Sequence, residues 1–423
     1  MNIVAYGEGF TPRPRLGQAA VLVENKIYYI GGVNYNESES GPSDFFYFDT
    51  SSYIWTDLQS QGVNIPFTVW HTANIGGVNE DSIFIIGGTH YDEIDNAYPN
   101  YIYRFDTKTN VIDIPEIQGK APIHRKGVNS ISYEGKIYMF GGQIEVNGKD
   151  IYLNNLFDIL DTVNLNWQVG SLVNSPVASA FYTATLVNGV IYYIGGTSGP
   201  DNFSPMTQIY QYDIVGNTWS LKTATAVDLE TIPGSRIGHS AVLVLNSKIV
   251  VYGGSYYNND TPYDVPAKNT MVVLDTNTLV WSIPQLDDVN VPKLTSHSAT
   301  VQFGTMMTVA FGNYTDKPNS EDQTNKSMFT FYFYPDMVKW QEMLLPTSAN
   351  TNTTTSKSQI PAPSGDFIPD TSQTSSKIII VCTSIGSVAV VLTILVVLTL
   401  VYKHMKKIKN EDKDQKDPKD LII

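Results

Sequence analysis

The stretch Ile27-Tyr28-Tyr29-Ile30-Gly31-Gly32 is an apolar run that ends in a glycine pair, and the chain repeats it. Each copy is followed by a second apolar run that ends in Asp. In most copies a Trp stands six residues after that Asp, as Trp55 follows Asp49 in the first. Short apolar runs bounded by Gly, Asn and Asp predict β-strands. Repetition of such a unit predicts a set of equivalent sheets around one axis.

The copies keep a nearly constant period over most of the chain. The glycine pairs begin at Gly31, Gly87, Gly141, Gly195 and Gly253, and a sixth copy decays to Gly312-Asn313. The Asp at the end of the second apolar run, and the residue six positions after it, recur with the same period. These pairs are Asp49–Trp55, Asp106–Ile112, Asp161–Trp167, Asp213–Trp219 and Asp275–Trp281, with Tyr334 in the Asp position before Trp340. Each copy holds four short strands, which in the fourth copy are 183–187, 190–196, 209–213 and 218–221. Six such units predict an all-β fold, a six-bladed β-propeller over residues 15–345.

The glycine pair, the Tyr or Phe beside an Asp, and the spaced Trp together resemble the kelch repeat over roughly residues 15–345. The resemblance implies a kelch β-propeller of the galactose-oxidase-like superfamily. Copper oxidases of that superfamily use a Tyr crosslinked to a Cys beside two His ligands. The one cysteine of this chain, Cys382, lies outside the repeats. The resemblance therefore does not extend to those catalytic residues, and no cofactor is predicted.

The composition changes after Trp340. Residues 346–376 are rich in Ser, Thr and Pro, which predicts a disordered stalk. The next domain, 377–402, contains the uncharged span from Ile378 to Tyr402, which is long enough for a transmembrane helix. Lysines follow the span directly, so the positive-inside rule predicts a charged cytosolic tail at 403–423 and an extracellular or lumenal propeller.

The amino-terminal residues leave the predicted location open. They lack the basic start and the apolar run of a signal peptide. Either a leader precedes this sequence, or the protein is tail-anchored with a cytosolic propeller. On a lumenal propeller the candidate glycosylation sites are the sequons at Asn36, Asn202, Asn259, Asn313, Asn325 and Asn352.

The loops on the two faces of the predicted ring differ in length. Because strands alternate in direction, the loops after the second strands and the connectors between blades open on one face, here called the long-loop face. Turns between first and second strands are short, such as Glu134-Gly135 and Asn188-Gly189. Loops 33–44, 89–100 and 255–269 are long and polar. The long-loop face is therefore the predicted ligand surface.

Three arginines precede the innermost strand in the frame Arg-x-Gly, namely Arg15, Arg125 and Arg236. In kelch propellers that bind acidic peptides, arginines in this frame line the central opening. The resemblance therefore nominates them as ligand-binding residues, suited to hold a carboxylate. The alternative is that they pair with acidic residues of the connectors. The matching positions of the other blades hold Thr68, Ser179 and Leu294.

Three histidines, His71, His239 and His297, stand three residues after that same position. They are candidate ligand-binding residues at the central channel, or hydrogen-bonded strand histidines. A metal site built from three blades is a further hypothesis, as is a cation bound by the acidic loop 90–95. No metal is predicted.

The formal net charge is −14, which argues against a nucleic-acid partner. No nucleophile elbow, phosphate loop or paired-metal motif is present in the sequence. The predicted function is therefore non-catalytic binding of a protein or glycan ligand by a propeller that one helix anchors in the bilayer. The alternatives are an enzyme acting on an acidic sugar in the channel, which requires a deep pocket with Arg, His and Glu, and a tail-anchored cytosolic scaffold.

Overall fold

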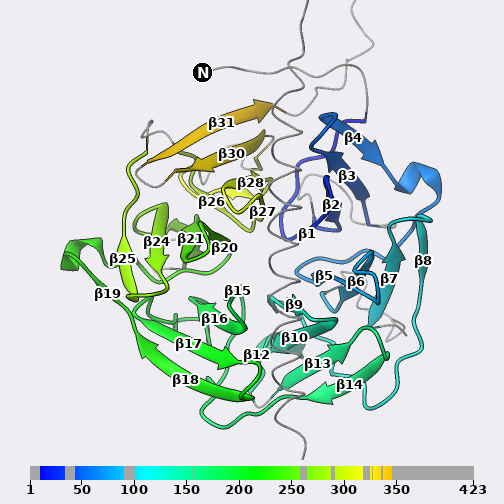
Figure 1. The fold of residues 1–423 in the computed structure, drawn as a ribbon, viewed down its shortest axis with the longest axis horizontal. Coiled ribbons are helices and arrows are strands. Elements are labelled where there is room, and N and C mark those ends of the chain that lie inside the picture. Colours follow the sequence, from blue (N-terminus) through cyan, green and yellow to red (C-terminus); the bar gives the residue numbers. More distant parts are fainter. Residues whose placement is uncertain are drawn as a thin grey trace, which may run out of the picture. The chain divides into compact units, whose positions relative to one another are not determined.

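The computed structural model describes residues 10–33, 43–89, 101–154, 156–257, 264–286, 291–317, 324–325, 327–334 and 337–344. The chain divides into two compact units, 1–351 and 352–423, and every described residue belongs to the first. In it, six antiparallel sheets surround a common centre (Figure 1). The predicted all-β, six-bladed propeller is confirmed.

Each blade is built from four strands in sequence order. Blade one holds β1 (Ala19–Val23), β2 (Lys26–Ile30), β3 (Phe45–Asp49) and β4 (Ile54–Asp57). Blade two holds β5 (Thr72–Gly76), β6 (Ser82–Ile86), β7 (Ile102–Asp106) and β8 (Val111–Asp113). Blade three holds β9 (Ile131–Tyr133), β10 (Lys136–Phe140), β13 (Phe157–Asp161) and β14 (Asn166–Val169), with a separate hairpin of β11 (Gln143–Val146) and β12 (Lys149–Tyr152).

The second half of the ring repeats the plan. Blade four holds β15 (Thr183–Val187), β16 (Val190–Ile194), β17 (Gln208–Asp213) and β18 (Thr218–Thr223). Blade five holds β20 (Ser240–Val244), β21 (Lys248–Tyr252), β24 (Met271–Asp275) and β25 (Val280–Ser282), extended by β19 (Thr225–Ala226), with β22 (Ser255–Tyr256) paired to β23 (Val265–Pro266). Blade six holds β27 (Ser298–Gln302), β28 (Met306–Ala310), β30 (Ser327–Phe333) and β31 (Val338–Leu344), with β26 (Leu294–Thr295) paired to β29 (Asn313–Tyr314).

Helix is confined to two short 3-10 turns in the described residues, η1 (Gln59–Gln61) and η2 (Leu229–Thr231). None of the described helices has the length and apolar character needed to cross a bilayer. The predicted stalk, the span from Ile378 to Tyr402 and the tail lie outside the described residues, so they remain predictions.

Apolar side chains form the core between neighbouring blades. Phe45 of blade one packs against Phe105 of blade two, with ring centroids 4.7 Å apart. Phe140 of blade three packs against Trp219 of blade four at 4.9 Å. The repeated strand aromatics therefore pack each of these blades against the next.

The glycine pairs join the blades through the backbone. In all six blades the amide of the second pair position donates to the carbonyl at the arginine-frame position of the next blade: Gly32 to Thr68, Gly88 to Arg125, Gly142 to Ser179, Gly196 to Arg236, Gly254 to Leu294 and Gly312 to Arg15. The last of these bonds closes the ring. At the first position of blade three there is no room for a side chain, because a Cβ on Gly141 would overlap the carbonyl oxygen of Ser179.

The sixth copy needs two corrections. The pair positions are held by Phe311 and Gly312, both with positive φ, rather than by Gly312 and Asn313. The Asp position is held by Tyr332, because Met306 pairs with Tyr332 as Lys26 pairs with Asp49. The hairpin between β30 and β31 is longer than its counterparts, and this insertion shifted the alignment that placed Tyr334 there.

Hydrogen bonds explain the constant spacing of six residues between the Asp and the Trp or Ile that follows it in the first five blades. In each of the first five blades the carboxylate accepts backbone N–H groups of the turn that follows, as Asp106 does from Lys108 at 2.8 Å and Thr109 at 3.0 Å. These bonds from Thr109 and Lys108 lower the pKa of Asp106. A hydrogen bond from Lys248, followed by one from the Asn277 amide, lowers the pKa of Asp275. The Asp therefore fixes the turn between the two outer strands.

We predict that these turns make the fold sensitive to acid. The folded-state pKa values of Asp49, Asp106, Asp161 and Asp275 lie below the unfolded value of about 3.9. The stabilisation is therefore complete above that pH and is lost as pH falls through the folded values. Urea unfolding of the full chain between pH 7 and pH 2.5 should show a falling midpoint below about pH 4. Asp106→Asn should flatten this dependence, and an unchanged slope would contradict the assignment.

Candidate functional site

Six residues form the inner rim of the long-loop face, one from each blade: Gly17, Trp70, Gly127, Phe181, Gly238 and Ser296. All six have positive φ, which is rare for residues as bulky as Trp70 (54°) and Phe181 (55°). Backbone bonds run around this rim, from Trp70 to Gly17, Gly127 to Trp70, Phe181 to Gly127, Ser296 to Gly238 and Gly17 to Ser296. The ring of bonds holds both aromatic residues in an unfavourable backbone conformation.

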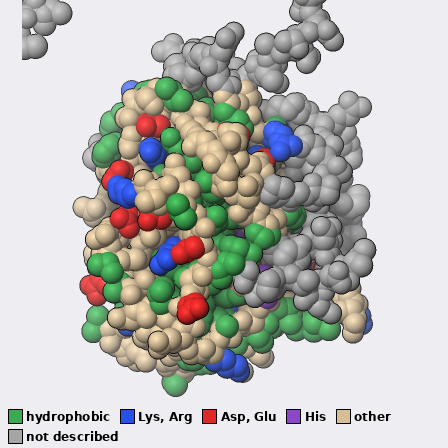
Figure 2. Space-filling model, turned by 90° about the vertical axis from the view of Figure 1, so that its right-hand side faces the viewer, with side chains coloured by type: hydrophobic (Ala, Val, Ile, Leu, Met, Phe, Trp, Pro, Cys, Tyr) green, Lys and Arg blue, Asp and Glu red, His purple; other side chains and the backbone are tan. Residues whose placement is uncertain are grey.

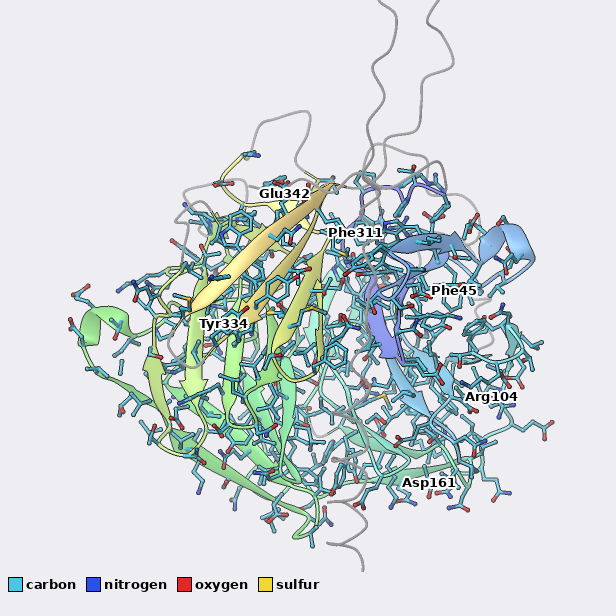
Figure 3. All side chains as sticks on the ribbon, turned by 45° about the horizontal axis from the view of Figure 1, so that its top comes forward. Phe45, Arg104, Asp161, Phe311, Tyr334 and Glu342 are labelled. Atoms are coloured by element: carbon cyan, nitrogen blue, oxygen red, sulfur yellow. The ribbon has the colours of Figure 1, made fainter. Side chains whose placement is uncertain are left out.

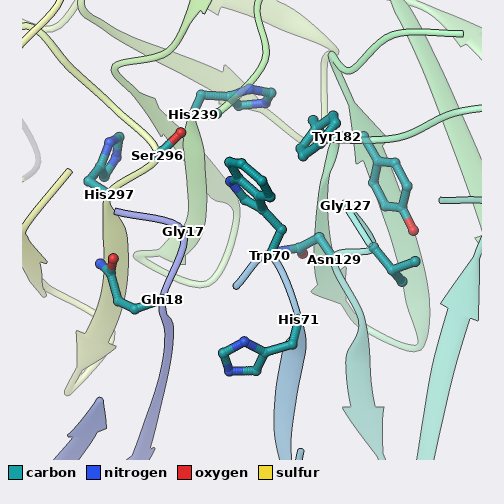
Figure 4. Close-up of a pocket in the computed structure, with 13 residues that line it drawn as sticks. Gly17, Gln18, Trp70, His71, Gly127, Asn129, Tyr182, His239, Ser296 and His297 are labelled. Atoms are coloured by element: carbon teal, nitrogen blue, oxygen red, sulfur yellow. The ribbon is translucent and has the colours of Figure 1, made fainter. Parts of the chain in front are cut away.

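A cavity of about 120 Å³, here called the central pocket, opens inside this rim (Figure 4). Its lining comprises Gly17, Gln18, Trp70, His71, Gly127, Val128, Asn129, Phe181, Tyr182, Gly238, His239, Ser296 and His297. The ring of Trp70 projects across the opening, and it lies 6.2 Å from the ring of Phe181 in an edge-to-face arrangement. Both aromatic side chains are half-buried.

The structure brings all three predicted histidines to the central pocket. Nε2 of His239 lies 3.1 Å from Thr183 Oγ1 and 3.1 Å from the carbonyl oxygen of Ile194. Nε2 of His297 lies 2.9 Å from Ser240 Oγ. Each ring also packs on the first glycine position of the preceding blade, as His71 does on Gly31. The histidines therefore help to join blades while they form the wall of the pocket.

The electrostatics of these histidines limit their chemistry. Burial lowers the pKa of both His239 and His297 to about 3, so both rings are neutral at physiological pH. No group of three or more His, Cys, Asp or Glu is placed to hold a metal ion anywhere in the described ranges. The three-blade metal hypothesis therefore finds no support in the geometry, and the acidic loop 90–95 lies outside the described residues.

The three predicted arginines are buried inside the blades, and none lines the central pocket. Arg15 pairs with Asp44, and Arg125 pairs with Asp158 at 2.7 Å. Within the described residues, Arg236 donates only to backbone carbonyls, including that of Gly253 at 2.9 Å. The partner acids belong to or directly precede third strands, whereas the sequence placed them in the connectors.

The described sequons differ in their surroundings. Asn202 is exposed. Asn325 is fully buried, and its amide donates to the carbonyl oxygens of Phe311 and Ser327. Asn313 lies in β29 and is half-buried. Asn36, Asn259 and Asn352 lie outside the described residues. Asn202 is therefore the accessible one of the three described sequon asparagines, whereas the Asn325 side chain is buried and bonds to the backbone.

Charge is dispersed over the surface visible in Figure 2, where acidic and basic side chains alternate among apolar and polar ones. One cation, Lys126, lies beside the rim, with its ammonium 5.7 Å from the centroid of the Trp70 ring. It also pairs with Asp150 at 3.5 Å. The central pocket therefore presents aromatic and neutral polar groups to a ligand rather than a ring of positive charge.

Sequence reasoning missed Trp70 and Phe181 as site residues. The signal was present, because the two stand at the third position of the arginine frame, where blades one, three and five have glycine. An aromatic residue at positive φ, in a position that three other blades fill with glycine, indicates a functional role for the side chain rather than a role in strand packing.

Six consecutive four-stranded blades joined by glycine pairs define a repeat β-propeller. The Kelch-repeats domain described for KLHDC2, KLHL20 and DRC7 matches residues 17–254 and 181–368. The chain belongs to the kelch-repeat β-propeller family.

Similar proteins share the fold over part of their length. The chain is 27% identical over 325 residues to acyl-CoA-binding domain-containing protein 5 of Arabidopsis thaliana, covering 74% of this chain and 46% of that protein. It is 27% identical over 259 residues to human kelch domain-containing protein 3, covering 57% and 64%. The chain thus spans about half to two thirds of these relatives. A solved structure, that of YjhT, aligns with a TM-score of 0.59 at 13% identity, over 78% of this chain and 98% of its own, which shows the fold alone.

Proposed function

We propose that this propeller is a non-catalytic binding module that takes a segment of a partner protein over the central pocket. The observation that carries the proposal is the pair Trp70 and Phe181, half-buried at the rim and held at positive φ across the opening. Large aromatic side chains at the centre of a surface are the commonest energetic anchors of protein interfaces.

The pocket favours binding over the alternative of an acidic-sugar enzyme. Such an enzyme needs a deep pocket in which Arg, His and Glu converge. The central pocket is about 120 Å³, and its lining residues include no Arg, Asp or Glu. Two of its three histidines have a pKa of about 3, far below the range of a general acid or base that works near neutral pH.

The composition of the rim also favours a protein segment over a glycan at this site. Gly17, Gly127 and Gly238 place no side chains beside the two aromatic rings, so Trp70 and Phe181 are the large side chains of the rim. A peptide can place apolar side chains on Trp70 and Phe181 while its polar groups meet the polar side chains of the pocket lining, such as Asn129 and Ser296.

Site-specific photocrosslinking tests this proposal. With p-benzoylphenylalanine in place of Phe181, we expect a discrete crosslinked partner in cells that make the protein. Placing the same residue at Phe303, which is 89% exposed in a turn on the opposite face, should not capture that partner. Adding Trp70→Ala should lower the crosslinking at position 181 about tenfold or more. Equal capture from positions 181 and 303 would refute a central binding site, and a glycan product would support the alternative ligand.

We further propose that the propeller is displayed outside the cytosol on the stalk 346–376, with Ile378 to Tyr402 as its membrane anchor. The support is the length of this uncharged span and the lysines that follow it. Carbonate extraction should leave the full-length protein in the membrane fraction. In sealed vesicles an added protease should remove a tag on the tail and spare the propeller if the propeller is lumenal. Loss of the propeller with a membrane-bound tail would establish the tail-anchored scaffold instead.

A further inference from the structure

A second cavity, of about 310 Å³, opens between the connector into blade four and the loop from β16 to β17. It is separate from the central pocket, with which it shares no lining residue. We call it the blade-four slot. The residues that matter here are Val177, Ser179, Tyr193, Gly195, Gln208 and Tyr210, all of which line it.

The slot occupies the place that an arginine side chain fills in other blades. Ser179 stands at the arginine-frame position, where blades one, three and five have Arg15, Arg125 and Arg236. In blade one, Arg15 donates through Nη1 to the Gly31 carbonyl at 3.0 Å and through Nε to the Arg13 carbonyl at 3.1 Å. Serine is too short to reach the equivalent carbonyls, so the volume stays open.

Blade five repeats the pattern, and there no described carboxylate pairs with the arginine. Arg236 donates through Nη1 to the Gly253 carbonyl at 2.9 Å and through Nε to the Gly234 carbonyl at 3.1 Å. Burial lowers its pKa only to about 10, so the guanidinium stays charged at pH 7. The propeller can therefore hold a guanidinium in this kind of slot with backbone carbonyls alone.

The blade-four slot retains the two carbonyl positions and the aromatic face that receive the guanidinium in blade one. Gln208 replaces the carboxylate of Asp44, and blade five shows that no carboxylate is required. Gly195 takes the place of Gly31, and Val177, two residues before Ser179, takes the place of Arg13. The pairs Tyr29–Phe46 and Tyr193–Tyr210 have the same register, so Tyr210 corresponds to Phe46. The guanidinium carbon of Arg15 lies 4.6 Å from the centroid of Phe46. An aromatic face for a cation is thus present in the slot.

Polar atoms in the slot lack protein partners. Ser179 and Tyr193 are 7% and 6% exposed, and neither hydroxyl bonds to a described residue. Neither oxygen is among the fully buried, unpartnered polar atoms of the described residues, so both hydroxyls face the slot and can bond to a ligand there. No lining residue carries a positive charge, and the chain has a net charge of −14. Both facts favour a cationic occupant.

We propose that the blade-four slot binds a guanidinium group, that of an arginine side chain presented by a partner or of a free arginine derivative. The ligand completes in trans the contacts that Arg15 and Arg236 make in cis. Because the slot shares no lining residue with the central pocket, binding of a guanidinium there does not depend on the proposed function of the central pocket.

Titration of the full-length protein with N-acetyl-L-arginine methylamide, followed by calorimetry, tests the slot. We expect a Kd on the order of millimolar, as befits a small ligand. The citrulline analogue keeps the shape without the charge, and the lysine analogue keeps the charge without the planar fork. Each should bind about tenfold more weakly or worse. Equal affinity for the citrulline analogue, or no binding of the arginine probe at 50 mM (roughly the ceiling for such weak ligands), would overturn the proposal.

Protein variants locate the binding. Ser179→Arg should fill the slot and abolish binding, whereas Val173→Arg places the same charge on an exposed position of the same connector and should change Kd less than about twofold. Gln208→Lys, at an exposed residue and so safe for folding, should weaken binding about tenfold by repulsion. Trp70→Ala should leave it unchanged. Loss of binding with Trp70→Ala, or retention of binding with both Ser179→Arg and Gln208→Lys, would refute this location.

A peptide containing arginine that binds at least tenfold more tightly than the amide would identify a protein source, and equal affinity would identify the free compound.

Discussion

Replacing Gly141 by alanine is expected to destabilise the propeller by about 4 kcal/mol or more, because the new Cβ has no space. It would overlap the carbonyl oxygen of Ser179 in the next blade, and that atom is backbone that cannot rotate away. The same carbonyl accepts the Gly142 amide at 2.8 Å, so the clash also breaks the bond that joins blades three and four. Positive φ at Gly141 (61°) adds a cost of about 1 kcal/mol for any side chain.

Gly148→Ala is the matched control for this substitution. Gly148 has a similar φ of 70°, but a Cβ there meets nothing within 4 Å. Only the backbone cost of about 1 kcal/mol should remain. Urea unfolding monitored by tryptophan fluorescence measures both variants. If both variants lost the same free energy of unfolding, the glycine pairs would be needed only for the backbone conformation of the turn and not for the close approach of neighbouring blades.

Replacing Phe311 by alanine should cost about 3–5 kcal/mol, since this side chain fills the seam that closes the ring. Phe311 is fully buried and occupies the first glycine position of blade six. Its ring lies edge-to-face on Tyr29 of blade one, with centroids 5.2 Å apart, and the guanidinium carbon of Arg15 lies 5.6 Å from its centroid. Figure 3 marks Phe311 beside the strands of the first blade. The large cost follows from the cavity that would open between the first and last blades.

Phe303→Ala removes the same side chain from an exposed turn of the same blade and should change stability by about 0.5 kcal/mol or less. Both variants can be followed by the same urea titration. If Phe311→Ala were as mild as Phe303→Ala, the seam between blades six and one would not depend on aromatic packing.

Repetition made the architecture predictable. Five glycine pairs and five Asp anchors in one phase, with a weaker sixth copy, predicted the number of blades and the strands of blade four, because each anchor has a local backbone role that favours one residue type. The sixth blade was misaligned, since Phe311 replaces the glycine that marked the pattern and the outer hairpin is longer.

The site was only partly predictable, because the direction of a side chain depends on neighbouring blades. His71, His239 and His297 were placed correctly at the channel, since strand periodicity fixes which face they share. The arginines stand three residues before the histidine position, but their side chains point into their own blades. There Arg15 pairs with Asp44 and Arg125 pairs with Asp158. Only the register between strands two and three reveals those partners. The opening left by Ser179 is likewise visible only when the blades are superposed.

Amide hydrogen exchange at single-residue resolution tests most directly whether six equivalent blades form a closed ring. Six equivalent backbone amides donate between blades, so five of them serve as internal standards for the exchange rate of the sixth. The sixth, Gly312, joins the last blade to the first through its 2.8 Å bond to the carbonyl of Arg15. The account predicts that the Gly312 amide is protected to within about tenfold of Gly142 and Gly196, because all six share one bonding geometry. Exchange of Gly312 at the rate of a free amide, with the other five protected, would show an open ring and contradict it.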